Sequence, residues 1–337
     1  MKPQRLTAIG LLPHSRRLLT SRARIASGAL TQSGLTLIEL MISLALGMLV
    51  VAAALILLLT SKSSYVIEDD SARLLDSGRY AIESIGRAVR QTAFEQLESE
   101  TVPVVGQPTD SPNIVGFDAT SFGGTPSTGL PTMVNATTPP SDLLQTRFIG
   151  AADGSVVDCA GVAASAVTSA AAVDAGRGWS IFFVKPVAGG EAELHCGYFN
   201  AAGSFLSSPI ASGVESFQLL YGIDTNGDGI PDRFVTATTL NTIDPLAMQP
   251  ANPNSLWKKV VAVKIALLLR GQRTQRSDVE NMVYDLFGSA YSDTNDVGSR
   301  ILEQNLAAAQ RARTRMVFST VIQLRNRANG GNVEPLP

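Results

Sequence analysis

A single long apolar run dominates the first part of the chain. Leu40 to Leu59 consists of Leu, Ile, Val, Ala and Met, interrupted only by Ser43 and Gly47. Because a helix rises about 1.5 Å per residue, this run spans about 30 Å, the hydrocarbon thickness of a bilayer. The pattern predicts a helix that crosses a membrane once.

An amphipathic pattern continues beyond Thr60. No proline occurs between Thr60 and Pro103, and apolar residues recur at helical intervals. They are Ile67, Leu74, Ala81, Ile85 and Val89. We therefore predict one helix of about 60 residues whose second half packs on a domain, with Gly47 and Gly78 each weakening it by about 1 kcal/mol.

From about residue 100 the composition changes to Gly, Pro, Ser, Thr and Ala, which is typical of loops. Short runs rich in Val, Ile, Phe and Leu indicate strands. They are Trp179–Val184, Glu215–Tyr221, Arg233–Ala237, Val260–Leu269 and Met316–Leu324. We expect an α+β fold in which the long helix packs on a single antiparallel β-sheet with long loops.

The region from Asp278 to Arg315 is partly acidic and partly rich in Ala and Arg. It predicts a second helical region, or equally an exposed excursion. The series Arg311, Arg313, Arg315 is typical of a solvated helix end, so we assign it no ligand.

The residues before and after the apolar run differ in charge. Residues 1–34 hold six of the 27 Lys and Arg residues and none of the 29 Asp and Glu residues, and Glu68, Asp69 and Asp70 follow the run. This asymmetry predicts a cytoplasmic N-terminus. Without residues 1–34 the net charge falls from −2 to −8, which argues against direct binding of nucleic acid.

Three interpretations of the N-terminal region compete. A cleaved secretory signal has a shorter apolar region, of roughly 7 to 15 residues. A plain uncleaved anchor explains the length and orientation, but not Glu39, since an unpaired carboxylate there costs about 2 to 3 kcal/mol. A leader cut after Gly34 would give Leu35 a positive amine four residues before Glu39, a spacing that allows an ion pair.

The stretch GLTLIELM, residues 34–41, resembles the start of type IV pilins and type II secretion pseudopilins, except that Leu35 replaces the usual Phe. The resemblance implies cleavage after Gly34 and N-methylation of Leu35 by a prepilin peptidase. It also implies that Glu39 pairs with the amino terminus of a neighbouring subunit during fibre assembly.

The chain has two cysteines, Cys159 and Cys196, and both follow the membrane run. The oxidising compartment favours a disulfide between them, which would stabilise the fold by about 3 to 4 kcal/mol in the chain-entropy treatment. The alternative is a pair of buried thiols.

The segment DTNGDGIPD, residues 224–232, offers oxygen ligands at a spacing that suits a hard cation, Ca²⁺ first. The candidate ligands are Asp224, Asn226, Asp228, the Ile230 carbonyl and Asp232. Val235 stands where an EF-hand has its bidentate Glu, and the flanking residues resemble strands. The alternative is a polar hairpin turn, because Asn-Gly and Asp-Gly favour turns.

Catalytic chemistry has little support in the sequence. The only histidines are His14, which lies in the leader, and His195 beside Cys196. No nucleophile elbow, phosphate loop or zinc pattern is present. We therefore expect no enzyme and no catalytic residues.

Four stretches resemble the minor pilin W family of type IV pili: SYVIEDDSARLLDSGRYAIESIGRAVRQTAF, VESFQLLYGIDTNGDGIPDRF, VVAVKIALLLR and MVFSTVIQLRNR. The resemblance implies a leader (1–34), a transmembrane and assembly helix (35–60), its amphipathic continuation (61–99) and a periplasmic or extracellular globular domain (100–337).

The same resemblance implies a low-abundance subunit that sits in the inner membrane and then at the pilus tip, where it primes assembly. The implied partners are other minor pilins, the major pilin, an adhesin-like tip protein, the prepilin peptidase and the inner-membrane assembly platform. Two alternatives stay open: a J-like minor pseudopilin of a type II secretion system, and an uncleaved membrane-anchored Ca²⁺-binding adhesive module.

Overall fold

The structure is a computed structural model, and two compact units make up the chain, Met1–Thr60 and Ser61–Pro337. Of the predicted leader, only Gly34 is among the described residues. The described residues are 34–95, 106–122, 133–135, 140–187, 190–200, 202–249, 252–274, 281–291 and 295–326.

The helix α1 runs from Leu37 to Gln91, so the predicted long helix is confirmed at 55 residues. It is the one described helix that is long and apolar enough to cross a membrane. Within its apolar part, the Ser43 hydroxyl donates to the Glu39 carbonyl at 2.6 Å, and the Thr60 hydroxyl donates to the Ile56 carbonyl at 2.9 Å. These bonds leave neither hydroxyl unpaired in an apolar medium.

The part of α1 in the second unit buries one face. Ala81, Ile85 and Val89 have no exposed surface. A Cβ added at Gly78 would lie 2.3 Å from the ring of Phe318, so the absence of a side chain lets the helix approach a strand closely. The sequence indicates Gly78 as a weak point of the helix, whereas in the structure it is a packing position.

Two antiparallel sheets, not the single sheet we predicted, form the globular unit. The five-stranded sheet has the order β1 (Ile114–Phe117), β4 (Leu143–Phe148), β5 (Gly178–Lys185), β6 (Glu193–Phe199), β7 (Phe205–Ser212). The four-stranded sheet has the order β13 (Arg313–Gln323), β10 (Val260–Thr274), β8 (Val214–Ile223), β9 (Arg233–Val235).

Shorter elements complete the described fold. Two small hairpins pair β2 (Thr120–Phe122) with β3 (Met133–Asn135), and β11 (Val283–Asp285) with β12 (Arg300–Leu302). The short helices are η1 (Ala170–Ala172), α2 (Val173–Gly176), α3 (Ala237–Ile243), η2 (Leu256–Lys259), η3 (Glu303–Asn305) and α4 (Ala308–Arg311).

Four of the five predicted strands coincide with β5, β8, β10 and β13. The fifth, Arg233–Ala237, ends at Val235 because Thr236 caps α3, its side chain accepting from the Thr239 N–H at 3.2 Å. Asp118 adds a second cap, since its carboxylate accepts from the Ala237 N–H at 3.0 Å. A run of residues with strand propensity therefore divides between a strand and a helix.

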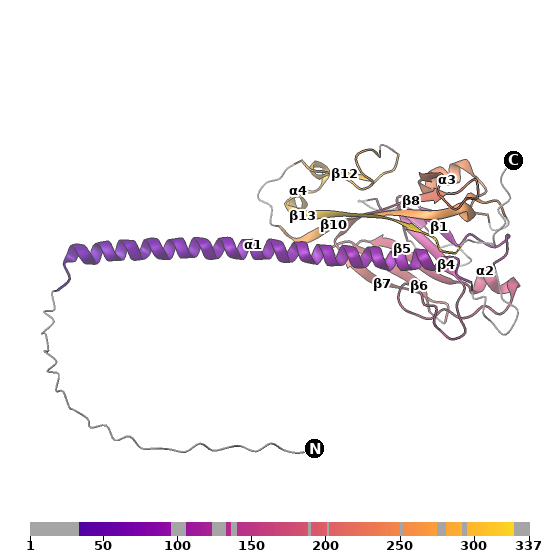
Figure 1. Cartoon of the computed structure of the whole chain (residues 1–337), viewed down its shortest axis with the longest axis horizontal. Helices are drawn as coiled ribbons and strands as arrows, with labels where there is room; N and C mark the ends of the chain where they lie inside the picture. Colours follow the sequence, from indigo (N-terminus) through magenta and orange to yellow (C-terminus); the bar gives the residue numbers. More distant parts are fainter. Residues whose placement is uncertain are drawn as a thin grey trace, which may run out of the picture. The chain divides into compact units, whose positions relative to one another are not determined.

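One hydrophobic core joins both sheets to α1. Ile85 of the helix, Phe182 of β5 and Ile265 of β10 belong to the same buried cluster. Figure 1 shows β10 and β13 above the second half of α1, and β6 and β7 below it. The helix therefore packs against residues of two sheets.

A buried carboxylate links the two sheets. Asp142, just before β4, donates its N–H to the Phe217 carbonyl of β8 at 2.7 Å, and its side chain accepts from the Leu219 N–H at 2.8 Å. Burial raises the pKa of Asp142 well above its usual value. Asp142 therefore provides hydrogen-bond partners for the Phe217 carbonyl and the Leu219 N–H, which bond to no neighbouring strand.

Residues 281–311, which we call the cap, lie between β10 and β13 and correct our prediction of a second helical region. Among the described residues the cap contains β11, β12, η3 and only a four-residue α-helix, α4. It covers the sheet face opposite α1, where Tyr284, Leu286 and Ile301 pack on Leu220 and Leu268. The segment is packed, so the exposed-excursion alternative is also wrong for these residues.

Of the arginine series, Arg313 and Arg315 lie in β13 and are not a solvated helix end, whereas Arg311 is the last residue of α4. Arg315 binds Glu215 through Nε at 2.6 Å and through Nη2 at 3.0 Å, and both side chains are buried. Arg270 binds the same carboxylate at 3.0 Å, and Arg313 binds Glu191 at 2.5 Å. The arginines form an internal ion network that ties strands together, because buried guanidinium groups need carboxylate partners.

Candidate functional site

The start of α1 forms a reciprocal cap around Glu39. Thr36 precedes the first helical residue, and Glu39 is the third residue of the helix. The Glu39 carboxylate accepts from the Thr36 N–H and from the Thr36 hydroxyl, both at 2.9 Å, while the Glu39 N–H donates to the Thr36 hydroxyl at 3.3 Å. This is a capping box, which pairs helix N–H groups that have no partner within the helix.

The capping box changes the argument about Glu39. The sequence predicts the Leu35 amine as the partner that the carboxylate needs, yet Thr36 already provides two donors within the same chain. Both bonds end on Oε2 of Glu39. Sequence reasoning missed the role of Thr36, although the spacing Thr-x-x-Glu before an apolar run is a known signal of a helix start.

The predicted cleavage junction is open to solvent. Gly34 and Leu35 are both exposed, and a Cβ added at Gly34 would meet no atom within 4 Å. Every large hydrophobic side chain from Leu37 to Leu59 is at least 53% exposed. Such a surface is stable only in a bilayer or against other apolar helices, because exposing it to water costs about 25 cal/mol per Å².

The two cysteines are joined as predicted. Cys159 and Cys196 form a disulfide with a Cα–Cα distance of 6.0 Å. Cys196 lies in β6 and is buried, and the Cys159 N–H donates to the Ser180 hydroxyl at 3.0 Å. The bond attaches the loop that contains Cys159 to β6 of the five-stranded sheet.

The acidic loop between β8 and β9 is folded by its own carboxylates. Asp224 accepts from the N–H groups of Gly227 at 2.6 Å and Gly229 at 2.7 Å. Both glycines have positive φ, 84° and 86°, which other residues adopt at a cost. Asp232 accepts from the Thr225 N–H at 2.7 Å, and the hydrogen bonds from Thr225 lower the Asp232 pKa.

A metal centre is not preformed in this loop. The Asn226 amide nitrogen donates to Asp228 at 3.1 Å and to Asp232 at 3.4 Å, while Asp224 is used by backbone groups. Within the described ranges, no three carboxylate, imidazole or thiolate side chains converge at metal-binding distance. The side chain of Ile230 is exposed.

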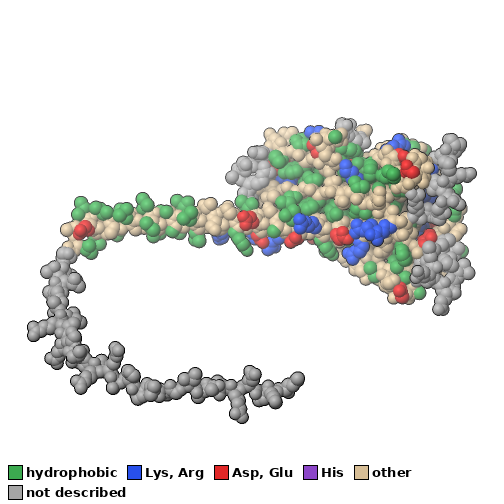
Figure 2. Space-filling model, in the orientation of Figure 1, with side chains coloured by type: hydrophobic (Ala, Val, Ile, Leu, Met, Phe, Trp, Pro, Cys, Tyr) green, Lys and Arg blue, Asp and Glu red, His purple; other side chains and the backbone are tan. Residues whose placement is uncertain are grey.

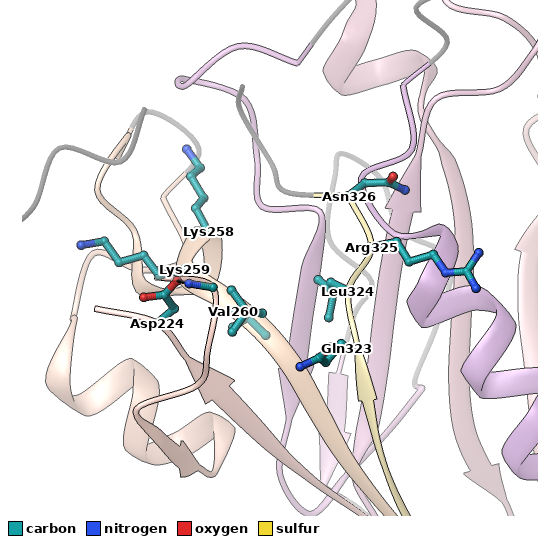
Figure 3. A pocket seen from close by; sticks show the side chains of 10 residues that line it. Asp224, Lys258, Lys259, Val260, Gln323, Leu324, Arg325 and Asn326 are labelled. Atoms are coloured by element: carbon teal, nitrogen blue, oxygen red, sulfur yellow. Dashed lines mark hydrogen bonds between the residues drawn. The ribbon is translucent and has the colours of Figure 1, made fainter. Parts of the chain in front are cut away.

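A small cleft of about 150 Å³ adjoins the loop, and Figure 3 shows its lining. Asp224 lies on one side and the end of β13 on the other. Lys258 and Arg325 extend away from Asp224 in different directions, and the Lys258 ammonium donates to the Pro108 carbonyl at 2.6 Å. The basic side chains therefore do not converge on a ligand in the cleft.

His195 has a structural environment. Its Nε2 lies 3.1 Å from a Glu193 carboxylate oxygen, and its ring lies beside Phe183. Burial lowers the pKa of His195, so the imidazole is held neutral near pH 7. The neighbouring Cys196 is in the disulfide, so the two residues form no thiol-imidazole pair.

Comparison with known families finds similarity in two separate ranges of the chain. Residues 30–55 match the prokaryotic N-terminal methylation motif, and residues 181–326 match the type IV pilus-assembly protein W family. Over residues 181–326 the chain is similar to the type IV pilus-assembly protein W family. The match to that family covers β5 to β13, including the disulfide partner Cys196, the acidic loop and the cap.

One solved structure that the comparison matches to this chain is the type IV-like pilin TTHA1219 from Thermus thermophilus. It is 15% identical, and the alignment covers 76% of this chain and 99% of that protein with a TM-score of 0.35. A score this low supports no statement about function. None of the curated proteins is significantly similar to the chain.

The match to the methylation motif agrees with the geometry at the helix start. The motif covers the exposed junction, the capping box and most of the exposed apolar run. Together the two matches fit a single-pass, membrane-anchored pilin whose partners are other pilins and the assembly machinery.

Proposed function

We propose that this chain is a W family pilin, a low-abundance subunit of the complex at the pilus tip, where it primes assembly and supports an adhesin-like protein. The observation that carries the proposal is the exposed apolar segment of α1, which contains one carboxylate, Glu39, at its start. A segment of this kind suits storage in a bilayer followed by packing among the helices of other subunits.

Processing supplies the complementary charge. A prepilin peptidase cuts after Gly34 and methylates Leu35, and the new amine is positive. During assembly, Glu39 of one subunit meets the Leu35 amine of a neighbour. Before that contact forms, the N–H and hydroxyl of Thr36 donate to the Glu39 carboxylate, so the carboxylate has hydrogen-bond partners while the subunit is stored in the membrane.

The orientation follows from the charge asymmetry, with the N-terminus cytoplasmic and the globular unit periplasmic before assembly. The disulfide fits that compartment. The large domain favours the tip, because a repeating shaft subunit would have to accommodate this bulk at every position.

Pilus counts in cells carrying Glu39→Ala test the proposal. We expect few or no surface pili with Glu39→Ala, and normal numbers with Ser43→Ala, a matched control one turn further along the same helix. Immunogold labelling of sheared pili should place the protein at their ends.

Normal piliation with Glu39→Ala would contradict the pairing role. Intact pili with loss of a secreted enzyme would instead support the J-like pseudopilin of a type II secretion system. Accumulation of the uncut chain in the membrane, with labelling absent from pili, would support the anchored adhesive module.

We also propose that the acidic loop binds Ca²⁺. The donors fit a hard cation in type: three carboxylates, the Asn226 amide oxygen and the Ile230 carbonyl. In the structure Asp228 and Asp232 accept hydrogen bonds from Asn226, Thr225 and the Ile230 N–H, which are all neutral donors, and a divalent cation would offset the two charges more fully.

Calorimetry on the full chain in detergent tests the calcium proposal. Wild type and Asp153→Ala, an exposed acid in another loop, should bind Ca²⁺ with the same affinity, whereas Asp228→Ala should not bind. Equal heats for Asp228→Ala and wild type would remove the site.

A further inference from the structure

The two larger sheets have four edges, and three of them are unsuited to accept a further strand. β1 has four residues and β9 has three. β7 is longer but contains Pro209, and its pairing with β6 shifts register there. Short strands, prolines and bulges are the devices by which proteins prevent edge-to-edge pairing.

The fourth edge, β13, has a register shift near Arg313 but lacks these devices from Met316 to Gln323. It has 11 residues, and from Met316 to Gln323 it contains no charge, proline or glycine. Val317 and Val321 are 38% and 50% exposed, and Ser319 is also exposed. Figure 2 shows hydrophobic and uncharged side chains along this part of the surface, beside a row of charged side chains on α1.

The backbone of β13 has hydrogen-bonding groups that point away from β10. The Leu324 N–H donates to the Val261 carbonyl at 2.9 Å, and the register runs unbroken from Ala262↔Gln323 to Arg270↔Arg315. In an antiparallel pair of strands, residues opposite one another alternate between hydrogen-bonded and non-hydrogen-bonded pairs. The odd-numbered residues therefore direct N–H and C=O outward; they are Val317, Ser319, Val321 and Gln323.

A second contact supports this assignment. The Arg270 N–H donates to the Gly213 carbonyl at 2.8 Å, so Arg270 turns its backbone toward β8 and away from its β13 partner Arg315. Arg315 consequently belongs to the outward-facing set, in agreement with the alternation counted from Leu324. The outward N–H and C=O groups of these five residues make an edge that matches an added strand.

We propose that β13 is a docking strand, to which one extended segment of a different protein adds as a further β-strand of the four-stranded sheet. The segment carries β-branched residues that pack beside Val317 and Val321. It carries carboxylates at its ends, because Arg313 and Arg325 flank the uncharged stretch. The inference concerns the chemistry of the partner and stands whether or not the chain lies at a pilus tip.

A second copy of this chain fits the edge poorly. Antiparallel self-pairing centred on Ser319 would place Arg313 opposite Arg325, and parallel pairing in register would place Arg325 beside Arg325. Like charges opposite one another destabilise paired strands. Arg313 is partly neutralised by Glu191, whereas Arg325 is exposed, so the Arg325 end favours a carboxylate most.

Two synthetic peptides test the proposal on the full chain in detergent micelles. Both alternate Val and Thr, one with Glu at each end and the other with Lys at each end, and anisotropy of a fluorescent label measures binding. The protein variants are Ser319→Pro, which removes only an outward N–H, and the matched Ser319→Ala. Ser319→Lys, which keeps every β10–β13 hydrogen bond, replaces Ser319→Pro if thermal unfolding shows that the proline variant is not folded.

We expect the Glu-ended peptide to bind wild type and Ser319→Ala equally. Ser319→Pro, or Ser319→Lys, should weaken binding roughly tenfold or more, because the edge is blocked. The Lys-ended peptide should bind wild type roughly tenfold more weakly, since its lysines face Arg313 and Arg325 and both charge pairs are reversed.

Equal binding by the proline and alanine variants would overturn the docking strand. Equal binding of the two peptides would overturn the acidic-ended partner. A dimer of the chain without peptide, seen by sedimentation and lost in Ser319→Pro, would show that a second copy occupies the edge.

Discussion

The two parts of α1 share a backbone but are built for different surroundings. From Leu37 to Leu59, every large hydrophobic side chain is more than half exposed, and apolar residues occur on all faces. From Asp70 to Val89, one face is buried and the other is polar. The comparison shows that hydrophobicity around the whole helix indicates a lipid or fibre environment, whereas hydrophobicity on one face indicates a protein core.

Truncation of one apolar side chain in each part should give the largest contrast. Ile85→Ala should lower the free energy of unfolding of the globular unit by about 2 to 5 kcal/mol, because Ile85 is fully buried. Leu49→Ala, at a site that is 66% exposed, should leave that free energy unchanged. Chemical denaturation of both variants in detergent measures the difference, and equal losses would break the comparison.

The disulfide should stabilise only the globular unit. Cys159→Ser with Cys196→Ser should lower its unfolding free energy by about 3 kcal/mol, because the 37-residue separation closes a long loop in the unfolded chain. The helicity of residues 37–60 should not change. Circular dichroism through a denaturant titration checks both expectations, and an unchanged midpoint would contradict the first.

The glycines of the two parts should respond with opposite signs. Gly78→Ala should destabilise the globular unit by about 1 to 3 kcal/mol, because the new Cβ would overlap the Phe318 ring. Gly47→Ala meets open space and should strengthen the helix by up to about 1 kcal/mol. Thermal unfolding and amide exchange measure the two effects. A stabilising effect of Gly78→Ala would show that the contact between the helix and Phe318 can accommodate a Cβ.

The smallest effect should come from the capping box. Thr36→Ala removes the hydroxyl that bonds to Glu39 and should destabilise the first turn by about 1 kcal/mol. Amide exchange of Glu39 and Leu40, whose N–H groups bond to Thr36, should accelerate, while exchange around Ile85 stays constant. Thr36→Ser keeps the hydroxyl and serves as the control; equal acceleration in both variants would show that the cap does not hold the turn.

The elements that could be predicted from the sequence are those whose pattern depends only on residues close together in the chain. The apolar run, the helix and four strands follow from periodicity alone. β4 was missed because its polar residues Gln145, Thr146 and Arg147 are buried, and their partners come from distant segments. The second sheet was missed with it.

Tertiary contacts also explain the wrong helical prediction for the cap. Residues 300–315 have strong helix propensity, yet Ile301 packs on the sheet, and Glu303 is fully buried within 3.5 Å of Arg315. These contacts override local propensity. At the candidate site, Glu39 was found from its charge, whereas Thr36 required attention to its spacing from Glu39.

The central claim, that the chain is processed at Gly34 and enters a fibre through its apolar helix, is tested most directly by N-terminal mass spectrometry of the protein in sheared pili. The account predicts a chain that begins with N-methylated Leu35 and is present in the pilus fraction. A chain that retains Met1 and occurs only in the membrane fraction would contradict it.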